Sequence, residues 1–304
     1  MPELPDITVY VDSLTAKVRG QVLRRLRVLN PFLLRTALPP ISAADGCTVS
    51  GIERLGKRVV LVLAPPVDRE DAGRELLLVM HLMIAGRLRW LAPGVRLPGK
   101  ITLAAFEFDT GQLVFTEAGT QRRASIHLLP DRAALAAMDP GGIDIFASGL
   151  PAFAAQLQRE NHTLKRSLTN PALFSGIGNA YSDEILHRAR LSPVKLTKAL
   201  TAEEIQRLLE ATRAVLSEWT AILRAEAEAH GGWPDKVTAF HPQMAVHGRY
   251  GQPCPVCQTP VQRILHADNE TNYCARCQTG GKLLADRALS RLLKASWPKT
   301  IDDL

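Results

Sequence analysis

The stretch "CPVCQTPVQRILHADNETNYCARC" (residues 254–277) places four cysteines in two close pairs. Two residues separate the cysteines of each pair, so a tight turn can point both sulfurs at one ion, and the sixteen residues between the pairs can form a hairpin. Two disulfides would need an oxidising compartment, of which the sequence gives no sign. The spacing therefore predicts one structural Zn²⁺ per chain, with these ligands: Cys254, Cys257, Cys274 and Cys277.

The composition is that of a globular protein. The chain has 304 residues, 46% of them hydrophobic and 22% charged, which is enough for two domains. We find no apolar run long enough to cross a bilayer and no secretory leader, so we expect a cytoplasmic protein with no membrane partner. The net charge of +7 favours a polyanionic partner such as nucleic acid, but it also fits a merely basic enzyme. The fifth cysteine, Cys47, is expected to be an inert buried thiol.

The part of the chain before about residue 145 reads mainly as β-strands. Short β-branched or aromatic runs bounded by turn residues predict strands at 58–64, 76–82, 101–108 and 112–117. One helix precedes them, with Asp6 as its expected N-cap and Gly20 as its end. The positive dipole end of this helix would point back toward Glu3.

The second half of the chain reads as helical. Thr201 and Glu204 form a capping box in front of a long amphipathic helix that ends at two glycines, residues 231 and 232. Upstream, Gly176 and Gly178 precede another helix, with Asn179 near its first turn. Backbone N–H groups at such a start can bind phosphate, but the pattern by itself is more often a simple turn. The Pro/Gly-rich stretch 139–151 is the expected domain linker.

An ordered set of motifs resembles one family. These motifs are "PELP" at residues 2–5, "LGKRVVLVL" at 55–63, "HLMIAGRLRW" at 81–90, "SGIGNAYSDEIL" at 175–186 and "VHGRYGQPCPVCQTPV" at 246–261. Together with "YCARC" they are similar to those of bacterial formamidopyrimidine-DNA glycosylases and endonuclease VIII. The resemblance implies an α+β protein: an N-terminal β-sandwich with a flanking helix, then a helical domain with a helix, two turns, helix element and a zinc-finger hairpin. The domains expected are 1–145 (catalytic), 146–240 (helical, DNA-binding), 241–281 (zinc finger) and 282–304 (tail).

The resemblance also implies catalytic residues. Loss of Met1 would expose the secondary amine of Pro2 as the nucleophile that attacks C1′ of a flipped nucleotide. Glu3 would protonate the sugar ring oxygen, and Lys57 would assist the leaving base and hold a phosphate. The implied function is a bifunctional DNA glycosylase and AP lyase of base-excision repair. We expect it to act as a monomer on damaged DNA in the bacterial cytoplasm, at the nucleoid.

Three further positions match DNA-contacting residues of the family. Asn179 matches the asparagine that contacts the phosphate beside the lesion. Lys165 matches a lysine at the same distance before that asparagine, but it could equally be a surface charge. Ile84 stands where the family often has a methionine that fills the hole left by the flipped base, and a core isoleucine is an equally good interpretation.

Two departures from the family bear on substrate preference. The family's Asp-Pro-Arg-Arg-Phe run is absent; Arg122 and Arg123 can replace its arginine, but Ala124 cannot act as an aromatic wedge. In the finger, Asn269 replaces an arginine, although Arg263 or Arg276 could supply the missing charge. We therefore expect better activity on abasic sites, on ring-opened or saturated bases and on loosened DNA than on 8-oxoguanine in stable duplex.

Other features leave alternatives open. The segment 231–243 is short where oxidised-guanine enzymes often carry a longer loop over the base. The tail has Arg287, Arg291 and Lys294 at helical spacing, which favours a solvated amphipathic helix packed on its domain. The alternative function is a noncatalytic, structure-selective DNA-binding protein on the same fold. A zinc-ribbon interaction module would leave most of the ordered motifs unexplained.

Overall fold

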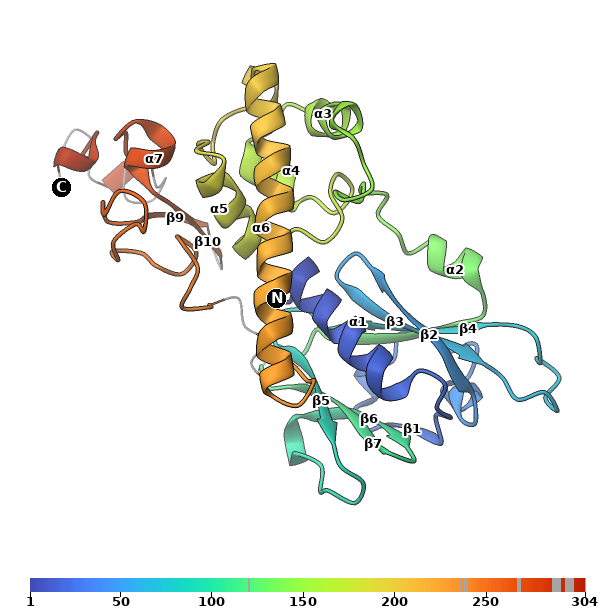
Figure 1. The fold of residues 1–304 in the computed structure, drawn as a ribbon. Coiled ribbons are helices and arrows are strands. Elements are labelled where there is room, and N and C mark those ends of the chain that lie inside the picture. The colour runs from blue at the N-terminus through green and yellow to red at the C-terminus, as the bar shows by residue number, and fades with distance from the viewer. Residues whose placement is uncertain are drawn as a thin grey trace. The chain divides into compact units, whose positions relative to one another are not determined.

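The computed structural model describes residues 1–119, 121–235, 237, 240–266, 269–285, 291–292 and 298–303 (Figure 1). The chain forms two compact units. The first, the N-terminal unit, comprises Met1–Pro140 and Trp219–Val237, and the second, the C-terminal unit, comprises Gly141–Glu218 and Thr238–Leu304. The expected domain boundaries at residues 145, 240 and 281 stay predictions.

Two four-stranded antiparallel sheets form the N-terminal unit. The first sheet has the order β2-β3-β4-β8 and the second has the order β1-β6-β7-β5. The strands of the first sheet are β2 (Thr48–Leu55), β3 (Arg58–Ala64), β4 (Leu76–His81) and β8 (Ser125–Leu129). Those of the second are β1 (Arg25–Val28), β5 (Gly86–Leu91), β6 (Thr102–Phe108) and β7 (Gly111–Glu117). All four predicted strands are present, with bounds that differ by at most one residue.

Strand β3 shows why its sequence is apolar without alternation. Val59, Leu61 and Leu63 point into the main core, which both sheets and helix α1 (Leu4–Val18) share. Val60 and Val62 face the other side, where a smaller cluster includes Leu135 of helix α2 (Arg132–Ala136). Because both faces of the strand are covered, neither can be polar.

Helix α1 begins earlier than its sequence pattern suggested. Its N-cap is Glu3, so the expectation that Asp6 caps the helix is wrong. Asp6 lies at the third helical position, where its Oδ2 accepts the backbone N–H of Glu3 at 2.8 Å. Pro5 fits the first turn because an N–H there would have no partner inside the helix. The helix lies against β2 and β3 (Figure 1).

The C-terminal unit is mainly helical. Its helices are α3 (Leu150–Gln158), α4 (Leu164–Thr169), α5 (Asn179–Arg188), α6 (Ala202–Ala229) and α7 (Ala275–Thr279). A hairpin of β9 (Gln262–His266) and β10 (Asn269–Tyr273) precedes α7. The predicted capping box of α6 is confirmed, since the Thr201 N–H donates to Glu204 Oε2 at 3.0 Å and the Glu204 N–H to Thr201 Oγ1 at 3.3 Å. The predicted α+β fold is confirmed.

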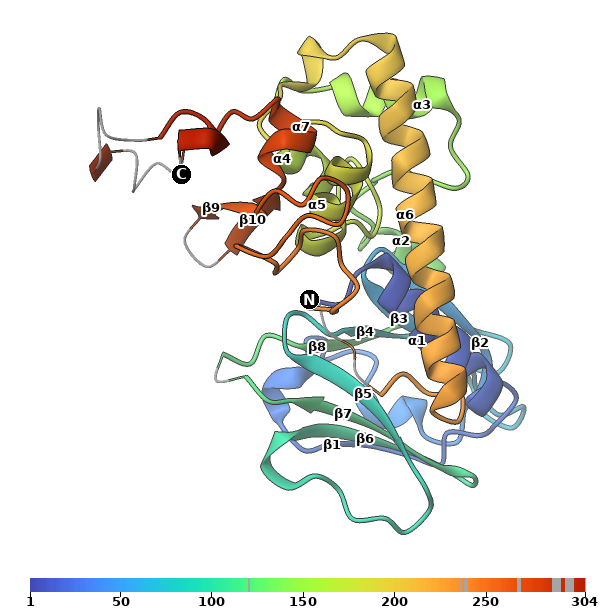
Figure 2. The same cartoon turned by 60° about the vertical axis from the view of Figure 1, so that its left-hand side comes forward.

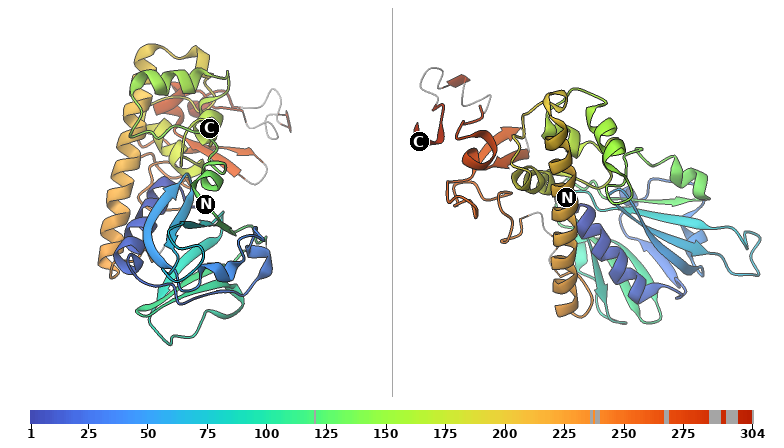
Figure 3. Two further views of the ribbon diagram at one scale, coloured as in Figure 1. Left: turned by 90° about the vertical axis from the view of Figure 1, so that its right-hand side faces the viewer. Right: turned by 45° about the horizontal axis from the view of Figure 1, so that its top comes forward.

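Helix α6 runs unbroken, and its last residues belong to the N-terminal unit (Figure 3). Arg224 Nε lies 2.7 Å from Asp12 Oδ2 on α1. Just after α6, Trp233 donates its Nε1–H to Leu88 O at 3.3 Å and lies 5.9 Å from Tyr10 between ring centroids. Trp233 therefore anchors the residues just after α6 to the sandwich.

The tail returns to the finger where the structure describes it. Ile301 packs in a small cluster with Tyr273 and Leu283, and its N–H donates to Gly281 O at 2.8 Å. Apart from residues 291 and 292, the expected tail helix with Arg287 and Lys294 lies outside the described residues. Among the described helices, none is both long and apolar enough to span a membrane.

Candidate functional site

The start of α1 and a hairpin tip bring the predicted catalytic residues into one unit. Pro2 and Glu3 are buried at the beginning of the helix. Lys57 lies in the two-residue turn between β2 and β3, where Gly56 has a φ of 59°, a conformation that favours glycine. The turn therefore presents the lysine at the end of a rigid hairpin.

Charges converge on the terminal amine. Burial lowers the pKa of the Met1 amine, and the positive charges of Arg87 and Lys57 lower it further, while Glu3 and Asp6 oppose them. Burial also raises the pKa of Asp6 to about 7. An amine kept partly neutral beside carboxyl groups suits nucleophilic chemistry. We call the residues Pro2, Glu3, Asp6, Lys57 and Arg87 the N-terminal cluster.

The turn from β4 to β5 carries two relevant side chains. Ile84 is 62% exposed, so it is not a core isoleucine. Arg87 Nη1 donates to Ile84 O at 3.0 Å and to Gly86 O at 2.7 Å. Figure 2 draws the N-terminus close to β5, the strand that bears Arg87.

The loop after β7 carries two of the predicted DNA-contacting arginines and, after them, Ala124. Arg122 and Arg123 are exposed; Arg122 donates to Lys100 O at 2.9 Å and Arg123 to Gln121 Oε1 at 2.8 Å. Ala124 is buried, and its N–H lies 3.3 Å from both oxygens of the buried Glu117 carboxylate. Ala124 is thus part of the core and offers no wedge.

The start of α5 gathers polar groups in the C-terminal unit. Asn179 is the first residue of the helix, and its Nδ2 donates to Glu270 O on β10 at 3.0 Å. Lys165 Nζ lies 2.6 Å from both Asn179 O and Asp183 Oδ1, and its side chain is only 13% exposed. Lys165 is therefore not a freely solvated surface charge, because it forms a largely buried ion pair.

Two adjacent carboxylates of α5 hold the segment that enters the finger. Asp183 Oδ2 lies 2.8 Å from His247 Nδ1 and accepts the N–H of Asn272 at 3.1 Å. Glu184 accepts three successive backbone N–H groups, those of residues 245, 246 and 247, at 2.7, 2.9 and 2.9 Å. Both carboxylates are buried, so these bonds fix the segment firmly to the helix.

The four paired cysteines form a compact metal site. Their sulfurs all lie within 4.8 Å of one another, with Cys254 to Cys277 at 3.9 Å and Cys257 to Cys274 at 3.3 Å. Four sulfurs at about 2.3 Å from a tetrahedral zinc are about 3.8 Å apart, so the site fits one Zn²⁺. The buried His187 of α5 places Nε2 3.3 Å from Cys254 Sγ, where an N–H can donate to the thiolate.

The finger hairpin separates Asn269 from the arginine nearest along its strands. Asn269 pairs with His266 and Arg263 pairs with Asn272, so alternation of side chains puts Asn269 and Arg263 on opposite faces. Arg263 stacks on Tyr250 at 4.2 Å and lies 3.5 Å from Glu270. The other candidate, Arg276, forms an ion pair with Asp302 at 2.7 Å.

Comparison with known proteins matches three family descriptions along the chain. They are the formamidopyrimidine-DNA glycosylase N-terminal domain at residues 1–124, the H2TH domain of the same enzymes at 144–227 and the zinc finger found in FPG and IleRS at 251–280. A formamidopyrimidine-DNA glycosylase of Symbiobacterium thermophilum is 32% identical, covering 91% of this chain and 89% of the relative. The chain belongs to the formamidopyrimidine-DNA glycosylase family.

Solved structures of the family have the same fold. The Thermus thermophilus protein matches with a TM-score of 0.72 and 29% identity over 91% of this chain and 98% of that one. The Lactococcus lactis protein, solved in complex with DNA that contains an abasic site, matches with a TM-score of 0.78 and 22% identity over 91% and 99%. The zinc site predicted from the cysteine spacing accords with the family's finger.

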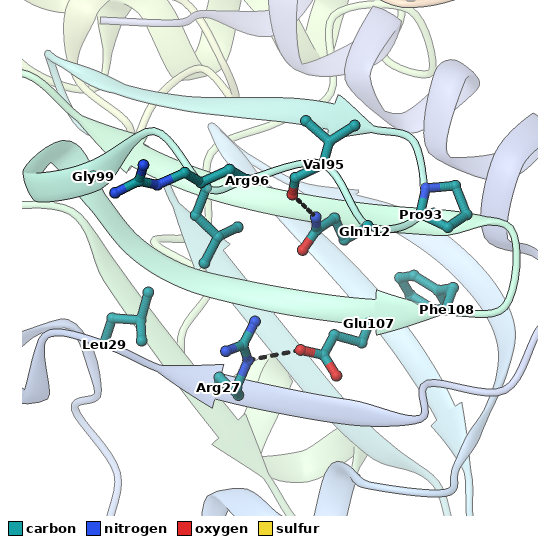
Figure 4. Close-up of a pocket in the computed structure, with 12 residues that line it drawn as sticks. Arg27, Leu29, Pro93, Val95, Arg96, Gly99, Glu107, Phe108 and Gln112 are labelled. Atoms are coloured by element: carbon teal, nitrogen blue, oxygen red, sulfur yellow. Dashed lines mark hydrogen bonds and ion pairs between the residues drawn. The ribbon is translucent and has the colours of Figure 1, made fainter.

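A cavity of about 650 Å³ lies apart from the N-terminal cluster. It opens beneath the loop between β5 and β6, where Arg27 is paired with Glu107 at 2.6 Å and Gln112 donates to Val95 O at 2.7 Å (Figure 4). None of the predicted site residues of this glycosylase family member lines it. The cavity is therefore not where the candidate chemistry lies.

Sequence reasoning missed several residues around the candidate site. Arg87 lies in the same motif as Ile84, and nothing in the local sequence marks it as a neighbour of the terminus. Asp183 and Glu184 stand in "SGIGNAYSDEIL", in which the glycines and Asn179 are the residues that the pattern marks. The available signal is a pair of adjacent acidic residues directly before the apolar Ile185 and Leu186, because carboxylates that become buried need donors.

Proposed function

We propose that this protein is a bifunctional DNA glycosylase and AP lyase that removes damaged bases in base-excision repair. The observation that carries the proposal is the gathering of the terminal amine, Glu3 and Lys57 in the N-terminal unit of a member of a glycosylase family. Removal of Met1 transfers the amine to Pro2, immediately before the buried carboxyl group of Glu3.

The glycosylase step forms a carbon–nitrogen bond and breaks another. The lone pair of the Pro2 nitrogen attacks C1′ of the flipped nucleotide, and the bond from C1′ to the damaged base breaks. The base takes up a proton with the help of Lys57, and Glu3 donates a proton to the ring oxygen as the sugar opens. Because proline is a secondary amine, loss of its own proton leaves a cationic iminium.

The lyase step follows from that cation. The iminium withdraws electrons from the neighbouring C2′–H bond, so a base can remove that proton and the 3′ phosphate leaves. A second elimination releases the 5′ phosphate. Hydrolysis of the iminium then returns the Pro2 amine, so no oxidant or reductant is needed.

The remaining positions are proposed to hold the DNA. Asn179, Lys165 and the segment they support would act near the phosphate beside the lesion. Ile84 would fill the void in the helix, with Arg122 and Arg123 alongside. Asn269 would donate a neutral hydrogen bond where relatives have an arginine. The net charge of +7 suits such a partner. We propose that the protein works as a monomer in the bacterial cytoplasm.

The test is cleavage of oligonucleotides that carry one abasic site. Wild type should cut the strand, and Pro2→Gly and Glu3→Gln should each lower the rate at least about a hundredfold. Tight binding to the same DNA with no cleavage by wild type would favour the noncatalytic, structure-selective DNA-binding alternative. Binding by both variants, measured separately, shows that they remain folded.

A further inference from the structure

Arg87 braces a tight turn. Its Nη1 donates to two carbonyls of the β4–β5 turn, Ile84 O at 3.0 Å and Gly86 O at 2.7 Å. The turn is sterically constrained, because a Cβ at Gly86 would lie 2.2 Å from Leu82 O and Met83 has a φ of 53°. These two hydrogen bonds therefore fix the backbone of the turn that bears the exposed Ile84.

The same strand is joined to α1 one residue further along. The Tyr10 hydroxyl donates to Leu88 O at 3.4 Å and accepts the Leu88 N–H at 3.3 Å. Tyr10 is buried, so this contact holds β5 against the helix that begins two residues after the candidate nucleophile, Pro2. Arg87 thus belongs to a rigid support and not to a mobile loop.

The charge of Arg87 lowers the pKa of the terminal amine, and Tyr10 ties the neighbouring Leu88 to the helix that begins near that terminus. Burial lowers the pKa of the Met1 amine; Arg87 and, more weakly, Lys57 add to this effect, and Glu3 and Asp6 oppose it. These four side chains come from the start of α1, the β2–β3 turn and β5. After loss of Met1 the amine moves by one residue along the chain, about 3.8 Å between Cα atoms, and stays among the same groups.

We propose that Arg87 is a positioning residue that serves two parts of the site: it holds the turn that presents Ile84, and it keeps a fixed positive charge beside the N-terminal amine. This rests on the proposed function. Arginine suits both tasks, because its long side chain places Nη1 within reach of both carbonyls and its guanidinium stays charged at any working pH. A positive neighbour disfavours the ammonium form, so more amine is available for attack at neutral pH.

The first experiment measures the pH profile of borohydride trapping on an abasic oligonucleotide. Arg87→Gln removes the charge, so the amine should need a higher pH to lose its proton. We expect trapping to fall about threefold at pH 6 and to differ by less than about 1.5-fold at pH 9. Arg87→Lys keeps the charge and should keep the wild-type profile. Arg89→Gln, an exposed arginine two residues along β5, is the matched control and should also leave the profile unchanged.

The second experiment measures binding alone and requires neither cleavage nor trapping. Wild type is bound to duplex containing a tetrahydrofuran abasic analogue with 2-aminopurine opposite, whose fluorescence reports how the void is filled. The Ile84→Ala variant gives the fluorescence expected when no side chain fills the void. Both Arg87 variants should lose about half of the difference between wild type and Ile84→Ala, because Lys and Gln are shorter than Arg and do not place a donor where Nη1 serves both carbonyls.

The outcomes separate this inference from the proposed function. Wild type that binds the duplex but is never trapped overturns the proposed function, and the fluorescence result then still decides the wedge role. A pH profile of Arg87→Gln that superimposes on wild type overturns the role of the charge. Fluorescence of both Arg87 variants equal to that of wild type overturns the bracing role.

Discussion

Asp6 illustrates how one buried carboxyl group ties stability to pH. Its Oδ2 accepts the Glu3 N–H at 2.8 Å, and burial raises its pKa from 3.8 to about 7. In the folded state Asp6 keeps its proton up to about pH 7, whereas the unfolded chain loses it near pH 4. Folding therefore loses stability from this group as the pH rises between these values.

Asp6→Asn should remove this dependence. The amide oxygen can still accept the Glu3 N–H, but the side chain cannot ionise. Relative to wild type, the free energy of unfolding of the variant should rise between pH 5 and pH 8 by on the order of 1 kcal/mol. Urea titrations of both proteins at the two pH values measure this difference. A difference that stays constant with pH would contradict the account.

Helix α5 connects the helical element to the finger through side chains that its glycine-rich start does not reveal. Glu184 accepts three backbone N–H groups from residues 245–247. Glu184→Gln turns an N–H group toward at least one of these donors, and it should destabilise the C-terminal unit by about 2–3 kcal/mol. Hydrogen exchange should show faster exchange of those three amides.

A control for that prediction lies on α6. Glu210 is exposed and only accepts a hydrogen bond from Gln206 at 2.9 Å, so Glu210→Gln should change stability by less than about 0.5 kcal/mol. Equal effects of the two substitutions, or unchanged exchange of the three amides in Glu184→Gln, would show that the carboxylate does not hold the finger segment.

His187 supports the metal site from the same helix. Its Nε2 lies 3.3 Å from Cys254 Sγ, and an N–H donated to a thiolate stabilises the zinc-bound form. His187→Phe should speed the transfer of zinc to a colorimetric chelator about tenfold, and His187→Gln should restore part of the difference. Identical release from wild type and His187→Phe would contradict this role.

The sequence predicts helices and strands better than it predicts where a helix starts or which distant residues come into contact. The apolar run 58–64 matches β3, and the Thr201–Glu204 box matches the start of α6, because these signals are local. The start of α1 was misplaced because Glu3 is an unusual cap and Asp6 a common one. Glu184 could not be assigned, since its partners are set by packing: residues 184 and 246 are 62 positions apart. The carbonyls that Arg87 contacts lie within three residues of it, but its place relative to the terminus depends on how β5 packs against α1.

Substrate preference is predicted at the scale of the whole chain, since the positions on which the prediction rests occur in both units. Arg276 is engaged with Asp302, and Arg263 lies on the other face from Asn269. These contacts support the expectation that the missing finger arginine is not replaced. Ala124 lies in the core, so an aromatic wedge is also missing. Weaker binding to DNA lowers activity most on intact duplex, which the enzyme must bend and unstack.

We therefore predict faster excision of ring-opened or saturated bases, and faster cleavage at abasic sites, than excision of 8-oxoguanine from stable duplex. Asn269→Arg should steepen the dependence of log binding constant on log salt by about one and should raise 8-oxoguanine excision most. Parallel assays of wild type and variant on an 8-oxoguanine duplex and a saturated-pyrimidine duplex measure this. Efficient 8-oxoguanine excision by wild type, unchanged in the variant, would refute the ranking.

The central claim is that the terminal amine is the nucleophile, and the most direct measurement is the mapping of the trapped adduct. Borohydride reduction during reaction with an abasic oligonucleotide, followed by digestion and mass spectrometry, should find the DNA remnant on a peptide that begins at Pro2 and lacks Met1. A blocked N-terminus should abolish the adduct. Attachment at a lysine such as Lys57, or full trapping by protein that retains Met1, would contradict the account.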